Sequence, residues 1–105
     1  MNLRALQCLR DFILLDAELK AKFAISTQEL HLLSFITNLW EDGEVTITLL
    51  LDKYDYTSPA TTHKRLDDLL KTKLVKKRVS NEDSRIKTLE IGDRYSALVK
   101  FLKEY

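Results

Sequence analysis

Basic side chains are concentrated in one part of this 105-residue sequence. Residues 59–87 contain nine lysines and arginines and four acidic residues, whereas residues 1–56 contain five basic and nine acidic residues. Clustered cationic side chains are typical of a surface that binds phosphate groups. The net charge of the whole chain is only +1, so the distribution of charge carries this interpretation. The alternative is that residues 71–78 form only a solvated helix end and edge strand. Lysine there discourages aggregation and balances the helix dipole.

Two short motifs in the basic segment have a defined chemistry. Ser58-Pro59 is typical of a helix start, because serine caps free backbone N–H groups and proline fits the first helical position. The N-terminus of such a helix also favours a bound phosphate. Asp83 and Arg85 stand two residues apart in a polar connector, where they can form an ion pair. An exposed pair of this kind, without a binding role, contributes only about 0–1 kcal/mol.

No constellation for catalysis or metal binding is present in the sequence. Gly43 and Gly92 are too far apart to form a phosphate-cradling loop. His31 and His63 lack the H-E-x-x-H spacing of a metal site, and no G-x-S-x-G elbow occurs. We therefore predict that the chain is not an enzyme and needs neither a metal nor another cofactor.

The sequence also predicts a cytoplasmic protein without membrane contact. Its single cysteine, Cys8, cannot form an internal disulfide, and no secretory leader precedes it. The apolar runs are only a few residues long, far short of the roughly 20 needed to cross a bilayer. Cys8 falls on the apolar side of a helix, where we expect a packed thiol; a redox switch is the alternative.

Apolar spacing predicts a mainly α fold with a small β-hairpin. The apolar residues of the first helix cover nearly half of its circumference, more than the stripe of roughly 100° that a surface helix needs. We therefore expect a second copy of the chain to pack against it. The predicted helices span residues 2–24, 26–41, 49–54, 58–72 and 95–105, with an extended piece at 45–47 and strands at 74–79 and 86–91.

The order of these elements and the residues of the basic segment together resemble the MarR-type transcription regulators. Residues 58–64, Ser-Pro-Ala-Thr-Thr-His-Lys, are similar to the start of the recognition helix of that family, and residues 81–85, with Asp83-x-Arg85, are similar to its wing. The resemblance covers about residues 27–95. Lys73 stands where the family usually has glycine, Gly92 where it usually has threonine, and the chain stops where the family adds longer C-terminal helices.

The resemblance implies a winged helix-turn-helix formed by residues 26–91, between an N-terminal dimerisation helix (1–25) and a C-terminal helix (92–105). It also implies a DNA-binding regulator, commonly a repressor, with the 58–72 helix in the major groove and the 80–85 wing in the minor groove. Thr61, His63 and Lys64 are expected at base edges. The full set of candidate DNA-binding residues is Ser58, Thr61, His63, Lys64, Arg65, Lys76, Arg78, Asp83, Arg85 and Lys87.

The expected partners are double-stranded DNA and a second copy of the chain. A two-fold dimer would match a palindromic site with half-sites about 34 Å apart or a multiple of it. A small-molecule effector is left open, and the sequence does not identify one. The alternative function is a winged-helix module for protein–protein interaction, whose acidic first half faces a basic partner.

Overall fold

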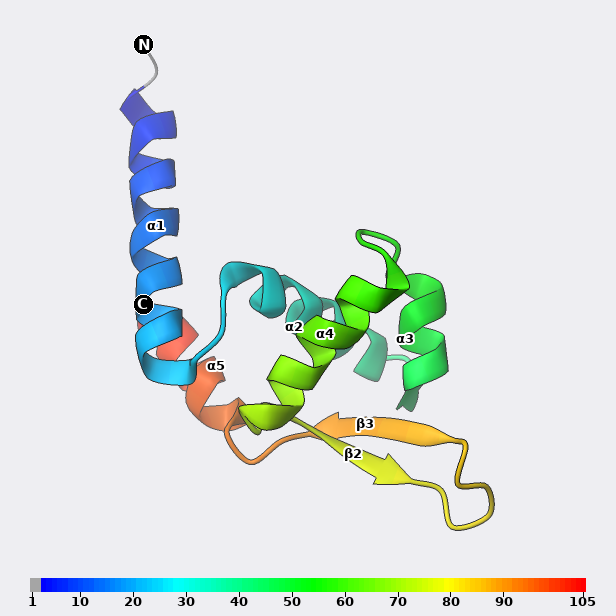
Figure 1. Cartoon of the computed structure of the whole chain (residues 1–105). Helices are drawn as coiled ribbons and strands as arrows, with labels where there is room; N and C mark the ends of the chain where they lie inside the picture. Colours follow the sequence, from blue (N-terminus) through cyan, green and yellow to red (C-terminus); the bar gives the residue numbers. More distant parts are fainter. Residues whose placement is uncertain (1–2) are drawn as a thin grey trace.

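Helices form most of the protein, and a three-stranded antiparallel sheet closes one side of it (Figure 1). The computed structural model describes residues 3–105. The mainly α fold with a hairpin, predicted from the sequence, is confirmed. In chain order the elements are α1 (Leu3–Phe23), α2 (Thr27–Trp40), β1 (Val45–Thr46), α3 (Ile47–Lys53), α4 (Pro59–Lys71), β2 (Val75–Val79), β3 (Lys87–Ile91) and α5 (Tyr95–Glu104).

Side-chain caps fix the start of two helices where the sequence predicted them. At α2, the Glu29 carboxylate accepts a hydrogen bond from the Ser26 backbone N–H at 2.6 Å, and the Ser26 hydroxyl accepts one from the Glu29 N–H. At α4, the Ser58 hydroxyl accepts from the Thr61 N–H at 3.2 Å, and Pro59 is the first helical residue. Both caps are local in sequence, so each helix start is specified independently of the rest of the fold.

The predicted start of the third helix was wrong by two residues. The sequence indicated an extended piece as far as Ile47, with the helix passing through Leu49, but α3 begins at Ile47. The Thr46 hydroxyl accepts a hydrogen bond from the Leu49 N–H at 3.0 Å and therefore caps the helix two residues earlier than expected.

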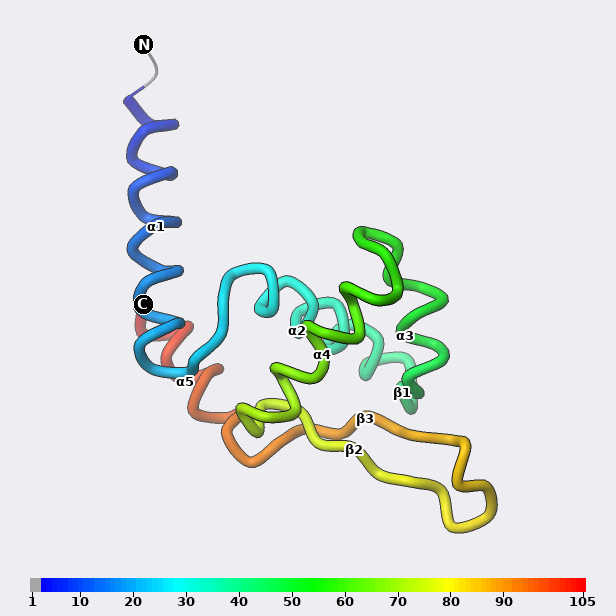
Figure 2. The backbone as a smooth tube through the Cα atoms, viewed as in Figure 1, coloured from blue at the N-terminus to red at the C-terminus, as the bar shows by residue number. Residues whose placement is uncertain are grey.

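The strands form a sheet in the order β1-β3-β2. Both hairpin strands begin one residue later than predicted, at Val75 and Lys87. The residues before them, Leu74 and Ile86, donate their backbone N–H groups within turns and are therefore not part of the strands. The two residues of β1 add a short third strand beside β3. Past the end of β1, toward the hairpin tip, the sheet consists of β2 and β3 alone, and this hairpin projects from the body of the protein (Figure 2).

One apolar core joins all five helices to the sheet. The predicted core positions Leu66 and Leu69 are fully buried, whereas Leu70 is only partly buried at the edge. Trp40 packs against the core and donates its indole N–H to the Leu89 carbonyl oxygen at 3.0 Å. The largest fully buried side chains from the helices include Leu19, Leu32, Ile36, Leu50 and Leu98.

The first half of α1 projects from the body of the protein (Figure 1). Only its C-terminal part packs, with the Phe23 ring 5.6 Å from the Phe101 ring of α5. Cys8, expected to be a packed thiol, is exposed, because no other part of residues 3–105 covers this end of the helix. The exposed apolar side chains of this half, which we call the α1 stripe, are Leu3, Leu6, Leu9, Phe12, Ile13 and Leu14. Across residues 3–105, every helix is too short or too polar to span a membrane.

The turn after α4 explains one of the three departures from the family pattern, the glycine at position 92. A Cβ atom at Gly92 would lie 2.3 Å from the Lys73 carbonyl oxygen, so only glycine fits this close approach of two backbone segments. The Gly92 N–H donates to the Leu74 carbonyl at 3.0 Å, which fastens the residue after β3 to the turn that joins α4 to β2. Lys73 has a φ of +63°, a left-handed conformation that is unfavourable for any residue with a Cβ atom.

We predict that Lys73→Gly stabilises the protein by about 1 kcal/mol, because glycine adopts the left-handed conformation without a Cβ clash. Chemical denaturation would measure the change. Lys71→Gly is the matched control: it removes the same charge two residues earlier, inside α4, and should destabilise by about 1 kcal/mol. The same sign for both variants would contradict the prediction.

Candidate nucleic-acid interface

The buried side of α4 decides which of its residues are available to a ligand. Thr62, Leu66 and Leu69 point into the core, and the Thr62 hydroxyl hydrogen-bonds the Thr57 hydroxyl at 2.9 Å. His63 and Lys64, in the first turns, are exposed on the rest of the helix surface. The structure therefore exposes two of the three predicted base-contacting side chains, His63 and Lys64, where a groove could reach them.

The start of α4 is a capped helix N-terminus that is exposed on the surface. Ser58 is exposed, and its hydroxyl donates to the Thr61 hydroxyl oxygen at 3.0 Å while accepting from the Thr61 N–H. Thr61 is partly buried against this cap. The 13-residue helix directs the positive end of its dipole toward this exposed start.

Arg65 turns away from the exposed surface of α4. Its side chain donates to the Gln28 side-chain oxygen of α2 at 3.3 Å. Burial raises the pKa of Tyr54, and the nearby Arg65 charge partly offsets that rise. Arg65 thus joins α2 and α4, and the structure does not bring it together with Lys64.

The strand register separates the predicted hairpin residues onto two faces. Lys76 and Arg78 lie opposite Glu90 and Thr88 and share one face with them. The other face contains the buried Val75 and Leu89 of the core, and also Lys77 and Lys87. Lys77 was not among the candidate residues. Side chains alternate between the two faces of a strand, so counting from the apolar Val75 would have put Lys77 on the same face as Lys87.

Arg78 is held by two carboxylates. Its Nε donates to the Glu90 carboxylate, and its Nη2 donates to the Glu44 carboxylate at 3.1 Å. These contacts raise the pKa of Arg78 above its ordinary value, and the hydrogen bond to Glu90 has the larger effect. The positive charge of Arg78 is therefore balanced locally.

The predicted ion pair at the hairpin tip is present. Arg85 Nε and Nη2 donate to the two carboxylate oxygens of Asp83 at 3.1 and 3.0 Å, and the Arg85 backbone N–H donates to the same group. The hydrogen bonds from Arg85 lower the pKa of Asp83. The Arg85 side chain is 89% exposed, so it projects from the tip while remaining oriented.

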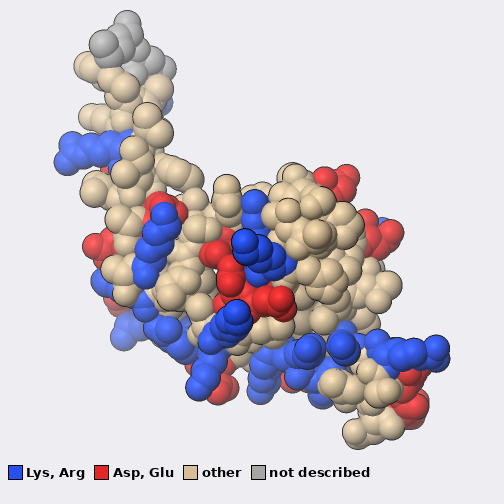
Figure 3. Space-filling view, viewed as in Figure 1, with Lys and Arg blue, Asp and Glu red and all other residues tan. Residues whose placement is uncertain are grey.

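In Figure 1 the exposed start of α4 lies at the upper right, beside α3, and the hairpin tip projects at the lower right. Figure 3 shows lysine and arginine side chains in a row along the hairpin, with acidic side chains nearer the centre of the same view.

Within residues 3–105 no three His, Cys, Asp or Glu side chains gather in a way that could hold a metal ion. His31 instead places its Nδ1 2.8 Å from the Tyr54 hydroxyl.

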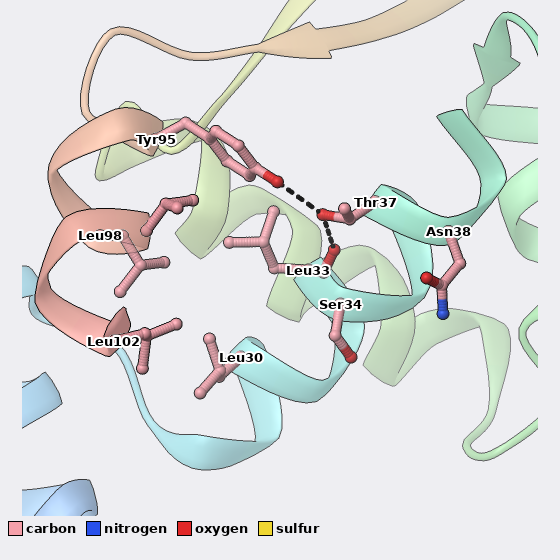
Figure 4. Close-up of a pocket in the computed structure, with 9 residues that line it drawn as sticks. Leu30, Leu33, Ser34, Thr37, Asn38, Tyr95, Leu98 and Leu102 are labelled. Carbon is pink, nitrogen blue, oxygen red and sulfur yellow. Dashed lines mark hydrogen bonds between the residues drawn. The ribbon is translucent and has the colours of Figure 1, made fainter. Parts of the chain in front are cut away.

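A recess of about 210 Å³ lies between α2 and α5 (Figure 4). Leucine side chains from both helices, including Leu30, Leu33 and Leu98, point into it. At one end the Tyr95 hydroxyl lies 3.1 Å from the Thr37 hydroxyl, which donates to the Leu33 carbonyl. The recess is mostly apolar with one polar end, and the effector left open by the sequence stays unassigned.

Several solved structures share this fold. S. aureus MepR, as a point mutant, has 21% identity and a TM-score of 0.65, with 85% of this chain and 62% of MepR aligned. The adhesin competence repressor AdcR from Streptococcus pyogenes has 20% identity and a TM-score of 0.57, with coverages of 99% and 72%. Streptococcus pneumoniae FabT in complex with DNA has 17% identity and a TM-score of 0.65, with coverages of 96% and 71%.

These likenesses confirm the winged helix-turn-helix fold that the resemblance implied. The chain spans less than two thirds of the length of MepR, and somewhat more of the other two proteins. No protein-family model and no curated protein matches the sequence.

We predict that Arg85→Ala raises the pKa of Asp83 part of the way to its ordinary value of 3.8, because two hydrogen bonds are lost while the backbone bond remains. An NMR titration of the carboxyl carbon would measure it. Since the folded pKa is lowered, the ion pair is fully formed above the ordinary pKa and is lost as the pH falls through the lowered value. Glu82→Gln is the control; an unchanged Asp83 pKa in Arg85→Ala would contradict the prediction.

Proposed function

We propose that this chain is a DNA-binding transcriptional regulator, acting as a repressor, with α4 in the major groove and residues 80–85 in the adjacent minor groove. The observation that carries the proposal is that the first turns of α4 leave His63 and Lys64 exposed while the projecting hairpin carries an oriented, 89% exposed Arg85 at its tip. The fold shared with FabT in complex with DNA and with the repressor AdcR supports it. We place the protein in the cytoplasm and assign it no enzymatic activity.

The first turns of α4 would determine the sequence preference. The major groove admits a helix and presents a distinct pattern of donors and acceptors for each base pair. Lys64 can donate to guanine O6 or N7, and His63 can donate or accept. The Thr61 methyl group can contact a thymine methyl, while the helix start near Ser58 favours a backbone phosphate.

The hairpin tip would contact the minor groove. Narrow minor grooves concentrate negative potential and attract arginine. Arg85 is exposed enough to enter such a groove, and Asp83 limits the number of side-chain conformations that binding must select. Lys87 lies at the root of the tip, at the start of β3, where it can contact a phosphate.

A second copy of the chain would cover the α1 stripe. Six large apolar side chains there are about half exposed or more, and a soluble monomer rarely leaves so continuous an apolar surface uncovered. Leu102 and Tyr105 of the C-terminal segment 92–105 extend the exposed apolar surface at the same end of the protein. A two-fold dimer would present two copies of α4 to half-sites about 34 Å apart.

The alternative is a winged-helix module that binds another protein and not DNA. A salt titration of duplex binding separates the two functions. A DNA-binding protein releases counterions, so the logarithm of its affinity falls linearly with the logarithm of the salt concentration. Selection of bound fragments from random DNA, followed by this titration, tests the proposal; the absence of salt-dependent duplex binding would support the protein-binding module.

We predict that Lys64→Ala costs about 1–3 kcal/mol on the preferred site and relaxes the sequence preference, because it removes a base contact. Lys71→Ala is the matched control, since it removes the same charge from the same helix two turns further from the exposed start. It should affect all duplexes equally. If Lys64→Ala keeps the full difference between preferred and random duplexes, the assignment of Lys64 is wrong.

We predict that Ile13→Glu converts the dimer to a monomer, because it places a charge in the middle of the apolar arc of the α1 stripe, where the wild-type side chain is 58% exposed. Sedimentation velocity would report the change in mass. Cys8→Glu adds the same charge on the side of the helix away from Leu6 and Ile13, and should leave the mass unchanged. A wild-type protein that sediments as a monomer at high concentration would reject the dimer itself.

A further inference from the structure

We infer that Arg78 is a positioning residue that sets the angle of the hairpin, and that Lys77, its neighbour on the opposite face of β2, supplies the phosphate contact. The inference rests on the proposed DNA binding and changes the assignment of one of its candidate residues.

The Arg78 guanidinium connects all three strands of the sheet. Arg78 lies on β2, at one edge, and it donates across to Glu90 on the central strand β3. Its Nη2 also reaches Glu44, which immediately precedes β1 at the other edge, at 3.1 Å. A planar guanidinium with several fixed donors can bridge two carboxylates in this way.

The hairpin has few other contacts that could fix its direction. β1 pairs with β3 only at Leu89 and Thr88, so the sheet narrows to two strands toward the tip. A two-stranded ribbon is marginally stable alone, and side-chain pairs across the strands provide much of its stability. Thr88 is directly opposite Arg78, which places the Arg78 bridge where the third strand ends.

The same contacts make Arg78 a poor phosphate ligand. Both carboxylates lie within hydrogen-bonding distance of its guanidinium, so an approaching phosphate would compete with two anions and be repelled by them. Lys77 is in the opposite situation. It is exposed, and no ion pair joins it to any other residue in the described range 3–105.

Lys77 also lies on the face of the sheet that is directed toward the helices. Its cross-strand partner is Leu89, and it shares this face with Val75, both of which are buried in the core that includes α4. A phosphate bound beside the exposed surface of α4 would therefore meet Lys77 before it met Arg78. Lys87, on the same face at the end of β3, continues this line toward the tip.

Salt titrations of the full-length chain with the selected duplex separate the two roles. For Lys77→Ala we expect the magnitude of the salt slope to fall by about one, as for the loss of one phosphate contact. For Arg78→Ala we expect a loss of affinity of about threefold to tenfold with an unchanged slope. Arg78→Lys keeps the charge but cannot bridge both carboxylates, so it should resemble Arg78→Ala.

The double variant Glu44→Gln, Glu90→Gln gives the sharpest contrast. If Arg78 positions the hairpin, losing both carboxylates weakens binding as Arg78→Ala does. If Arg78 binds phosphate, the double variant frees its charge and tightens binding. Tighter binding, or a reduced slope in Arg78→Ala together with wild-type binding by Arg78→Lys, would overturn the inference, as would an unchanged slope in Lys77→Ala.

Amide hydrogen exchange in the free protein tests the positioning role without DNA. Exchange at residues 76–79 should become faster in Arg78→Ala and in the double variant, and should stay unchanged in Lys77→Ala. Wild-type protein that binds no duplex would end the proposed function, and the exchange result would still decide the role of Arg78. Duplex binding with unchanged exchange in Arg78→Ala would reject the inference and leave the proposed function intact.

Discussion

The packing of the buried side of α4 against the core is the contact on which the rest of the structure depends. Thr62, Leu66 and Leu69 fix the rotation of the helix about its own axis, because burying them leaves only one set of side chains outward. His63 and Lys64 are exposed as a result. The hydroxyl contact between Thr57 and Thr62 satisfies the one polar group on this side, so the helix can be buried without an unpaired donor.

Electrostatic pairing then divides the basic residues into those that are occupied and those that are available. Arg78 is balanced by two carboxylates, and Arg65 is directed toward α2. Lys64 and Lys77 remain exposed on the surface near α4, and Arg85 is oriented but still projects. The count of basic residues in 59–87 therefore overstates the charge that a ligand would meet.

The two ends of the protein have different surfaces. The start of α4 and the hairpin tip, with the exposed His63, Lys64 and Arg85, lie away from the projecting half of α1, which carries the α1 stripe (Figure 1). The overall extents of 57 × 27 × 24 Å reflect the projection of α1. Between the ends, the contact of Phe23 with Phe101 fastens α1 to α5, and Gly92 fastens the sheet to the turn after α4. Association at one end and ligand binding at the other can therefore take place on separate surfaces.

The sequence by itself determined the features that depend on neighbouring residues. The caps at Ser26 and Ser58 and the pair of Asp83 with Arg85 join residues two or three positions apart, so their residue types and spacing are sufficient to predict them. The early start of α3 at the Thr46 cap was equally local but was missed, because an apolar extended stretch and a helix start share the same residues.

Only the tertiary structure decided how the basic residues are used. The contact between Arg78 and Glu44 joins positions 34 residues apart and exists because three strands align in one register. A shift of one residue in that register would exchange the faces of Lys77 and Arg78. The register is fixed by burial of Val75 and Leu89 against the helices, a property of the folded core that no local pattern contains.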